Sequence, residues 1–192
     1  MHPHAVLRRC LALLVLALAV GCGAAASPPP VATPAATDAV GLPRDAFDVT
    51  VVRVVDGDTI LARVGGRGPS LRVRILGIDS PESVKPDTPV ACYGHEASAL
   101  TMSLLSKGSH ISAAYEKERQ DKYGRELWDL WLPDGRFLAT LLAASGTVRP
   151  DPFKPNIAYA GPIGAAAREA HDAGRGLWGH CSFSDAFPEV RQ

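Results

Sequence analysis

Two carboxylates stand three residues apart where a strand is expected to end. Residues 71–75 alternate apolar side chains with arginines, which is typical of a strand. Asp79 and Glu82 follow, and Pro81 between them cannot donate a hydrogen bond to a β-ladder. Carboxylate oxygens suit a hard cation such as Ca²⁺, and a glutamate can act as a general base. The residue types permit metal-assisted chemistry, although this stretch alone also fits an edge strand with a surface charge pair.

The same strand carries Arg74, whose planar guanidinium fork fits a phosphate group. In a regular strand Arg74 and Asp79 would point to opposite faces, because successive side chains alternate. Gly77 lies between them and can host a bulge or a bend. We therefore predict a bend at Gly77 that brings Arg74 and Asp79 together.

Turn sequences and periodicity predict the elements that hold these residues. Residues 47–55 and 59–64 are rich in β-branched side chains and flank the tight-turn sequence Asp56-Gly57-Asp58. The expected elements, in chain order, are strands at 47–55, at 59–64 and from 71, a helix around 97–105, strands at 110–115 and 125–132, and helices at 137–145 and 163–173.

Five short strands with a helix between the third and the fourth predict an α+β fold of a particular kind. It is an OB-type, five-stranded closed β-barrel capped by three helices. An open α+β sheet is the alternative. Residues 150–155 contain three prolines and are expected to be irregular.

The overall charge excludes a protein that binds nucleic acid through a globally basic surface. The 192 residues include 20 basic and 20 acidic ones, so the formal net charge is zero. Without residues 1–22, which contain Arg8 and Arg9 and no acidic residue, 18 basic residues remain against 20 acidic ones. A nucleic-acid partner would therefore be held by a local basic cleft.

The first residues resemble an export signal of the bacterial lipoprotein type. Arg8 and Arg9 precede an apolar run that is too short to span a membrane comfortably, and the run ends in Ala19-Val20-Gly21-Cys22. Residues 1–22 are thus a predicted signal peptide with lipidation at Cys22, and ordinary cleavage after residues 24–26 is the alternative. We expect the protein at the outer face of the cell membrane, anchored by lipid, or secreted.

The remaining chain divides into a tether and a folded domain. Residues 23–46 are rich in Ala, Pro, Ser and Thr and poor in large apolar residues, so they are expected to be a disordered tether. Residues 47–192 form the predicted domain, which keeps two cysteines, Cys92 and Cys181. A disulfide between them fits an oxidising compartment. The alternative is a zinc site, since His95 and His180 lie beside these cysteines.

Four motifs occur in one order along the domain. They are Val-Asp-Gly-Asp-Thr at 55–59, Arg-x-x-x-x-Asp-Ser-Pro-Glu at 74–82, Tyr-Gly-x-Glu-Ala-Ser at 93–98 and Asp-Lys-Tyr-Gly-Arg at 121–125. Each motif alone is weak, because turns of this composition are common. Together they resemble the staphylococcal (thermo)nuclease family, and the resemblance runs from about Asp48 to Trp178.

The resemblance implies a calcium-dependent site. Asp58 and Asp79 would be carboxylate ligands of one Ca²⁺, with the main-chain carbonyl of Ser80 as a third ligand. The family more often has Thr at the position of Ser80, and a main-chain ligand tolerates that change. Glu82 would orient or deprotonate the attacking water.

The resemblance also implies which residues contact the substrate. Arg74 and Arg125 would bind the scissile phosphate, and Lys122 and Tyr123 would line the pocket for the neighbouring phosphate and sugar. One departure concerns two family tyrosines that precede Lys-Pro-Asn, where this chain has Asp151 and Phe153. Phe153 keeps an aromatic face for a base and Asp151 does not, so we expect a weaker or altered base preference.

The implied activity is Ca²⁺-dependent hydrolysis of DNA and RNA phosphodiester bonds with little sequence specificity, leaving a 5′-hydroxyl and a 3′-phosphate. A divalent cation and two fixed guanidinium groups would meet the negative charge that develops on the phosphate oxygens. The alternative is a non-catalytic OB-type module that binds single-stranded nucleic acid outside the cytoplasm. No obligate protein partner is implied.

Overall fold

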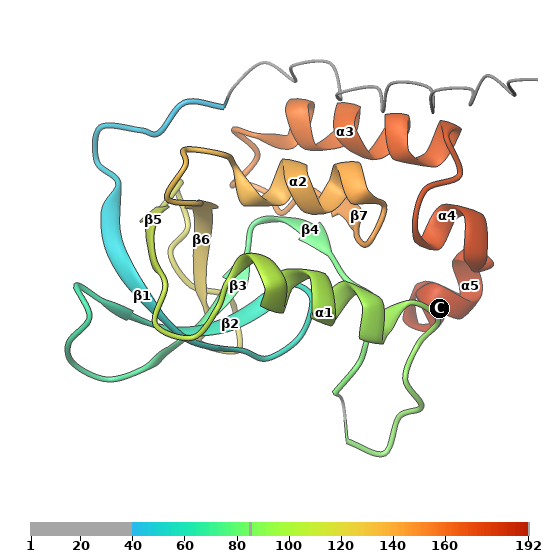
Figure 1. Ribbon diagram of the computed structural model, residues 1–192, viewed down its shortest axis with the longest axis horizontal. Helices are drawn as coiled ribbons and strands as arrows, with labels where there is room; N and C mark the ends of the chain where they lie inside the picture. Colours follow the sequence, from blue (N-terminus) through green and yellow to red (C-terminus); the bar gives the residue numbers. More distant parts are fainter. Residues whose placement is uncertain (1–39, 85, 192) are drawn as a thin grey trace, which may run out of the picture. The chain divides into compact units, whose positions relative to one another are not determined.

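The computed structural model describes residues 40–84 and 86–191 (Figure 1). The predicted signal peptide, the lipidation site Cys22 and most of the predicted tether lie outside these residues, so they stay predictions. Within the described ranges, no helix has the length and apolar character needed to cross a membrane.

Five strands close into a barrel, as the sequence predicts. They are β1 (Phe47–Val54), β2 (Thr59–Val64), β3 (Leu71–Ile75), β5 (His110–Ala114) and β6 (Glu126–Trp131), in the spatial order β1-β2-β3-β6-β5. The β3–β6 pair is parallel, the other pairs are antiparallel, and β5 pairs with β1 to close the ring. The OB-type closed barrel is therefore confirmed, and the open sheet is not found.

Alternating side chains fill the barrel. Val49 and Val51 on β1 and Ile60 and Ala62 on β2 are buried, which is the two-residue period of a strand with one face in a core. All six residues of β6 are buried, and the helix Leu138–Ser145 packs against this strand.

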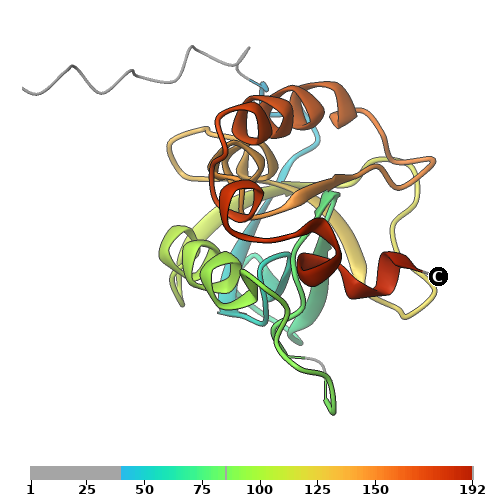
Figure 2. The same cartoon turned by 90° about the vertical axis from the view of Figure 1, so that its right-hand side faces the viewer.

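Three longer helices lie in the regions that periodicity predicts, two of them against barrel strands and the third against the second helix and the small sheet described below. They are α1 (Gly94–Leu104), α2 (Leu138–Ser145) and α3 (Ala160–Asp172), and α3 lies along α2 in both views (Figures 1 and 2). Two one-turn helices, α4 (Leu177–His180) and α5 (Phe183–Ala186), and a 3-10 turn at Pro188–Arg191 follow them. These short elements are additions to the predicted three helices, since a single turn carries no periodic pattern.

A small second sheet interrupts the predicted third strand. Gly77 has φ +77°, the left-handed region that suits glycine, and the chain restarts there as β4 (Gly77–Asp79). The predicted bend at Gly77 is thus confirmed. Strand β4 pairs with β7 (Arg149–Asp151), so the expectation that residues 150–155 are irregular is wrong for its first two residues. Pro150 is tolerated because a two-stranded sheet has outer edges that need no N–H donor.

Both ends of the described domain are attached to its body. The Cys92–Cys181 disulfide is present, with an S–S distance of 2.06 Å, and it confirms the predicted pairing in place of the zinc site. It joins the start of α1 to the region of α5 (Figure 1). At the other end, the indole Nε1 of Trp131 donates to the carbonyl of Val40 at 3.0 Å. The last residues of the predicted tether therefore contact the domain.

Candidate active site

One cavity collects the residues that sequence analysis assigns to the metal and the chemistry. This cavity has a volume of about 840 Å³, and its lining includes Asp58, Arg74, Asp79, Ser80, Glu82 and Arg125. It adjoins a smaller cavity of about 410 Å³, and the two share Arg74, Tyr123, Arg125 and Asp151. The bend at Gly77 and the parallel β3–β6 pairing bring these side chains together from four separate segments.

Arg74 is the centre of the charged cluster. Its Nε lies 3.5 Å from Oδ1 of Asp58, and its Nη2 lies 3.1 Å from Oδ1 of Asp79 and 3.5 Å from Oδ2 of Asp151. Its Nη1 donates to the carbonyl oxygens of Ile75, at 2.8 Å, and of Ile78. Because the fork is bound to main chain on one side and to carboxylates on the other, its orientation is fixed.

Asp58 links the first hairpin turn to the segment after β4. Its Oδ2 accepts the backbone N–H of Ser80 at 2.8 Å, and its Oδ1 accepts the hydroxyl of Thr59 at 2.9 Å. The backbone N–H of Asp58 donates to Oδ1 of Asp56 at 3.1 Å, which stabilises the turn. Asp58 is therefore bonded to the residue that follows Asp79, and both acids contact Arg74.

Asp79 has a second arginine partner that sequence analysis missed. Arg149 on β7 donates to Oδ2 of Asp79 from Nε at 2.9 Å, and its Nη2 is 2.7 Å from the same oxygen. Asp79 and Arg149 are directly paired in the β4–β7 ladder. Only this pairing could have identified Arg149, because the two residues are 70 positions apart and β7 is too short to show a pattern.

The carboxylates of the cleft repel one another. Burial and the neighbouring Asp58 raise the pKa of Asp79 to about 6 and that of Asp56 to about 7. Burial alone would lower the pKa of Arg74, but the carboxylates of Asp58 and Asp79 outweigh it and raise that pKa. Arg74 and Arg149 offset part of this negative charge.

The donor set fits a hard cation with oxygen ligands. Two crowded carboxylates beside a main-chain turn are the ligand types that Ca²⁺ takes, and a bound cation would relieve their repulsion. No group of three or more His, Cys, Asp or Glu side chains in residues 40–84 and 86–191 is arranged to hold a metal. A cation between Asp58 and Asp79 would therefore need main-chain carbonyl oxygen and water to complete its shell.

Glu82 lies in the loop after β4 and is oriented by that loop. Its Oε1 accepts the backbone N–H groups of Ser83 and Val84, each at 2.9 Å. Two donors on one oxygen restrict the side chain, and the carboxylate faces the larger cavity with Asp58 and Asp79. The arrangement suits a carboxylate that orients a water molecule.

Arg125 is held at the tip of the turn that precedes β6. Its Nε donates to Oδ2 of Asp121 at 2.6 Å, while Oδ1 of Asp121 accepts the backbone N–H groups of Tyr123 and Arg125 at 2.9 and 3.0 Å. Although burial opposes it, these bonds from Arg125 lower the pKa of Asp121. The carboxylate thus fixes both the turn and the guanidinium.

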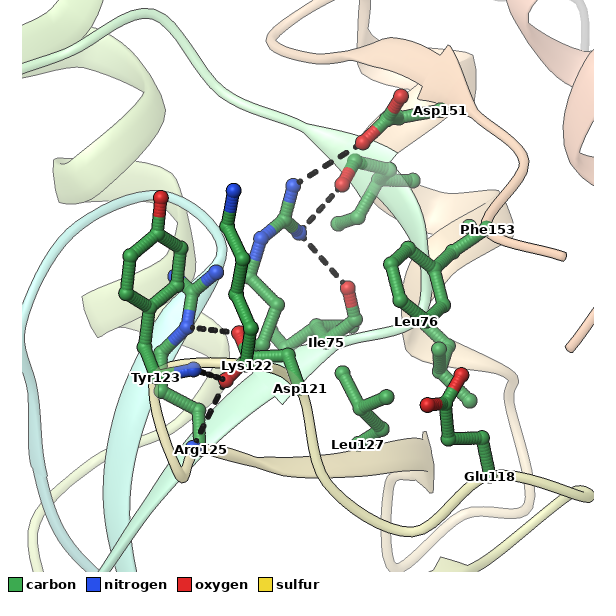
Figure 3. Close-up of a pocket in the computed structure, with 13 residues that line it drawn as sticks. Ile75, Leu76, Glu118, Asp121, Lys122, Tyr123, Arg125, Leu127, Asp151 and Phe153 are labelled. Atoms are coloured by element: carbon green, nitrogen blue, oxygen red, sulfur yellow. Dashed lines mark hydrogen bonds and ion pairs between the residues drawn. The ribbon is translucent and has the colours of Figure 1, made fainter.

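The smaller cavity is bordered by charged, aromatic and apolar side chains (Figure 3). Figure 3 shows Lys122, Tyr123 and Arg125 on one side and Asp151 and Phe153 on the other. Leu127 and Glu118 also line it. The Nζ of Lys122 is 5.0 Å from the centroid of the Tyr123 ring, whose residue is 72% exposed. A flat apolar group such as a base could lie between these rims, next to the two arginines.

Two acidic residues of this cleft were not assigned a charged role from sequence. In the sequence Asp151 stands out as the loss of an aromatic ring, yet its carboxylate also lies beside Arg74. Glu118 has no role in the predicted site, yet it lines the cavity with Phe153. No local pattern distinguishes such carboxylates from exposed ones.

Comparisons with known proteins identify the family of this chain. The family model "Staphylococcal nuclease homologue" matches residues 72–180. A thermonuclease of Staphylococcus hyicus is 38% identical over 128 residues, which is 67% of this chain and 73% of the relative. A thermonuclease of Staphylococcus intermedius is 41% identical over 128 residues, 67% of this chain and 74% of the relative. The SPbeta prophage-derived endonuclease YokF of Bacillus subtilis is 34% identical over 137 residues, 70% of this chain and 45% of the relative. The chain belongs to the staphylococcal nuclease family, a family of enzymes that hydrolyse phosphodiester bonds.

Proposed function

We propose that this nuclease cleaves DNA and RNA with little sequence specificity in a Ca²⁺-dependent reaction that leaves a 5′-hydroxyl and a 3′-phosphate. The observation that carries the proposal is the shared cavity, which is lined by all six residues assigned to the metal and the chemistry. The curated relatives named thermonuclease and endonuclease support the substrate class.

Asp58, Asp79 and the Ser80 carbonyl would hold the cation. A bound Ca²⁺ supplies positive charge for the phosphoryl oxygens as negative charge develops there. Arg74 and Arg125 supply fixed donors for the same oxygens, and both side chains are already oriented by carboxylates. A phosphate oxygen would thus take the place of a carboxylate oxygen as the acceptor, and the guanidinium groups would move little.

Glu82 would orient the attacking water and accept its proton. The two N–H groups on its Oε1 hold the carboxylate in place. Lys122 and Tyr123 would bind the neighbouring phosphate and sugar, while Phe153 would stack on a base in the smaller cavity. With a carboxylate at Asp151 in place of a second ring, base preference would be weak or altered.

The direct test is digestion of long single- and double-stranded DNA and of RNA, with Ca²⁺ and then with a chelator, by wild type and Glu82→Gln. We expect wild type to cleave when Ca²⁺ is present and not after the chelator is added. The rate of Glu82→Gln should be lower than that of wild type by about 10²-fold or more. The product ends should accept a 5′-phosphate label without prior phosphatase treatment, since they carry a 5′-hydroxyl.

A matched control separates the role of Glu82 from the effect of removing one negative charge elsewhere on the protein. Glu169 on α3 lies outside the linings of both cavities and pairs with Arg175 at the surface. Glu169→Gln should cleave like wild type. Equal digestion by wild type and Glu82→Gln, with and without the chelator, would refute the proposed site.

We further propose that the protein is exported and held by lipid on Cys22 at the outer face of the cell membrane. The leader sequence and the disulfide, which persists in oxidising compartments, support this location. Cys22→Ser should move the nuclease from the membrane fraction to the medium or the periplasm. An unchanged distribution between these fractions would count against lipidation.

A further inference from the structure

The carboxylate of Asp79 is held from two sides. Arg74 contacts Oδ1 at 3.1 Å, and Arg149 contacts Oδ2 at 2.7 Å with Nη2 and at 2.9 Å with Nε. Directly opposed residues of an antiparallel pair place their side chains on one face, so the β4–β7 register brings Arg149 to Asp79. With both oxygens bound, the plane of this carboxylate is fixed.

Arg149 in turn lies against an aromatic side chain from the end of the chain. Its Cζ is 4.7 Å from the centroid of the Phe187 ring and 6.0 Å from that of Phe183. Phe187 is fully buried, whereas Phe183 is 47% exposed. A guanidinium over an aromatic face is attracted by the ring quadrupole. The ring also restricts a long side chain that would otherwise occupy several rotamers.

The segment that carries Phe187 is itself fixed to the domain. The disulfide joins Cys181 to Cys92, and the backbone N–H of Cys92 donates to the carbonyl of Asp185 at 3.0 Å. Phe187 packs in a small apolar cluster with Leu177 and Ala186.

The residues that follow Phe187 reach the cleft. Pro188 and Glu189 line the larger cavity together with Asp79 and Arg149. The end of the segment 181–189 is thus part of the wall of the active site, and Phe187 is the buried contact of this segment with Arg149.

We infer that Phe187 is a positioning residue, which acts through Arg149 to fix the carboxylate of Asp79 for cation binding. The inference rests on the proposed function, in which Asp79 is a Ca²⁺ ligand. A carboxylate that is already oriented loses less freedom when a cation binds, so preorganisation raises the affinity. Phe187 contacts neither cation nor substrate in this scheme.

Two changes at Phe187 test this without altering the net charge. Phe187→Leu removes the ring but keeps an apolar side chain. Replacing Phe187 by pentafluorophenylalanine keeps the ring and its shape but reverses the potential of its face. We expect each to raise the dissociation constant for Ca²⁺, measured by calorimetry without substrate, by about three- to tenfold. Phe183→Leu is the matched control, with an expected change below about twofold.

A second readout does not depend on Ca²⁺. In the cation-free protein, the Nε–H of Arg149 is bonded to Asp79, so its NMR signal should exchange slowly with water. We expect faster exchange in both Phe187 variants, at an unchanged signal for Arg125. The fluorinated variant keeps the test valid if Phe187→Leu fails to fold.

The outcomes are distinguishable. An unchanged Ca²⁺ affinity together with an unchanged Arg149 signal in folded variants would overturn the inference and leave Phe187 a purely structural residue. If wild type itself bound no Ca²⁺, the proposed function would fail, and the Arg149 signal would then support or overturn the positioning on its own.

Discussion

Carboxylates that are buried or half-buried lie in the active-site cleft and on strand β6, and their surroundings differ. In the cleft, Asp58 and Asp79 lie beside Arg74, and Arg149 also contacts Asp79. On β6, Asp129 is 1% exposed, and neither of its carboxylate oxygens accepts a hydrogen bond from the described part of the chain. Burial and the nearby Glu116 carboxylate raise the pKa of Asp129 to about 8. Both places therefore raise the pKa of an acid, but only the cleft supplies counter-charge.

The difference shows what makes a buried acid part of a site. Asp129 lines neither cavity, so a ligand bound in either of them would not contact its carboxylate. The cleft carboxylates face an open cavity and are held by arginines from other strands. A raised pKa alone is thus a weak indication of function, whereas a raised pKa with an oriented partner and an opening is a strong one.

The largest expected effect tests the cleft half of this comparison. Asp79→Asn keeps the size of the side chain but removes the charge that would bind the cation and that pairs with Arg74 and Arg149. We expect the cleavage rate at saturating Ca²⁺ to fall about 10²- to 10³-fold. Steady-state rates across a Ca²⁺ titration would measure the loss.

The matched control for Asp79→Asn is the same substitution at Asp129. Asp129→Asn should retain the wild-type cleavage rate and the wild-type Ca²⁺ dependence. A similar loss of rate in both variants would mean that the two kinds of buried acid do not differ in function as we state.

The next effect concerns the disulfide, which holds the segment that contacts Arg149, the partner of Asp79. Within residues 40–84 and 86–191, Asp129 has no such arginine partner. Replacing both Cys92 and Cys181 by Ser opens a loop with a sequence separation of 89 residues. We expect a loss of up to about 4 kcal/mol in the free energy of unfolding, because the unfolded chain gains freedom. Urea titrations of the oxidised wild type and the double variant would measure it.

The same double variant should bind Ca²⁺ more weakly, since the segment that carries Phe187 is no longer tied to α1. Wild type treated with a reductant is the control and should behave like the double variant. Urea midpoints that coincide for oxidised wild type and double variant would show that the disulfide does not stabilise this end of the chain.

The barrel could be predicted from sequence because its signals are local. Alternation, the Asp56-Gly57-Asp58 turn and the parity between Arg74 and Asp79 each involve neighbouring residues, and they place the β1–β3 side of the cleft correctly. In a regular strand the side chains of Arg74 and Asp79 would point to opposite faces, so bringing them to one site requires the bend at Gly77.

The C-terminal side of the cleft could not be predicted in the same way. Strand β7 has three residues with a proline in the middle, and α4 and α5 are one turn each, so none of them has a readable period. Arg149 reaches Asp79 through a pairing that joins strands far apart in the chain. Sequence alone also could not show that Asp151 pairs with Arg74, because a missing aromatic ring was the visible feature there.

The smallest expected effect tests the Asp129 half of the comparison and depends on pH. The unfolded chain releases the proton of this acid near the ordinary pKa of 3.8, while the folded protein holds it up to a pKa of about 8. Between these values the folded state binds more protons than the unfolded state, so this acid lowers the free energy of unfolding as the pH rises. The slope is at most about 1.4 kcal/mol per pH unit.

Asn resembles the protonated acid and cannot ionise, so Asp129→Asn should gain stability relative to wild type as the pH rises from 5 to 8, by up to about 1.4 kcal/mol per pH unit, and should gain little more above pH 8. Urea unfolding at pH 5, 7 and 9 would measure the difference. Because Glu116 contributes to the shift, Glu116→Gln should give a smaller gain in the same direction. If the free energy of unfolding changed with pH in the same way for wild type and Asp129→Asn, Asp129 would ionise freely in the folded protein. Its burial would then carry no electrostatic cost, and it would not differ in this respect from the acids of the cleft.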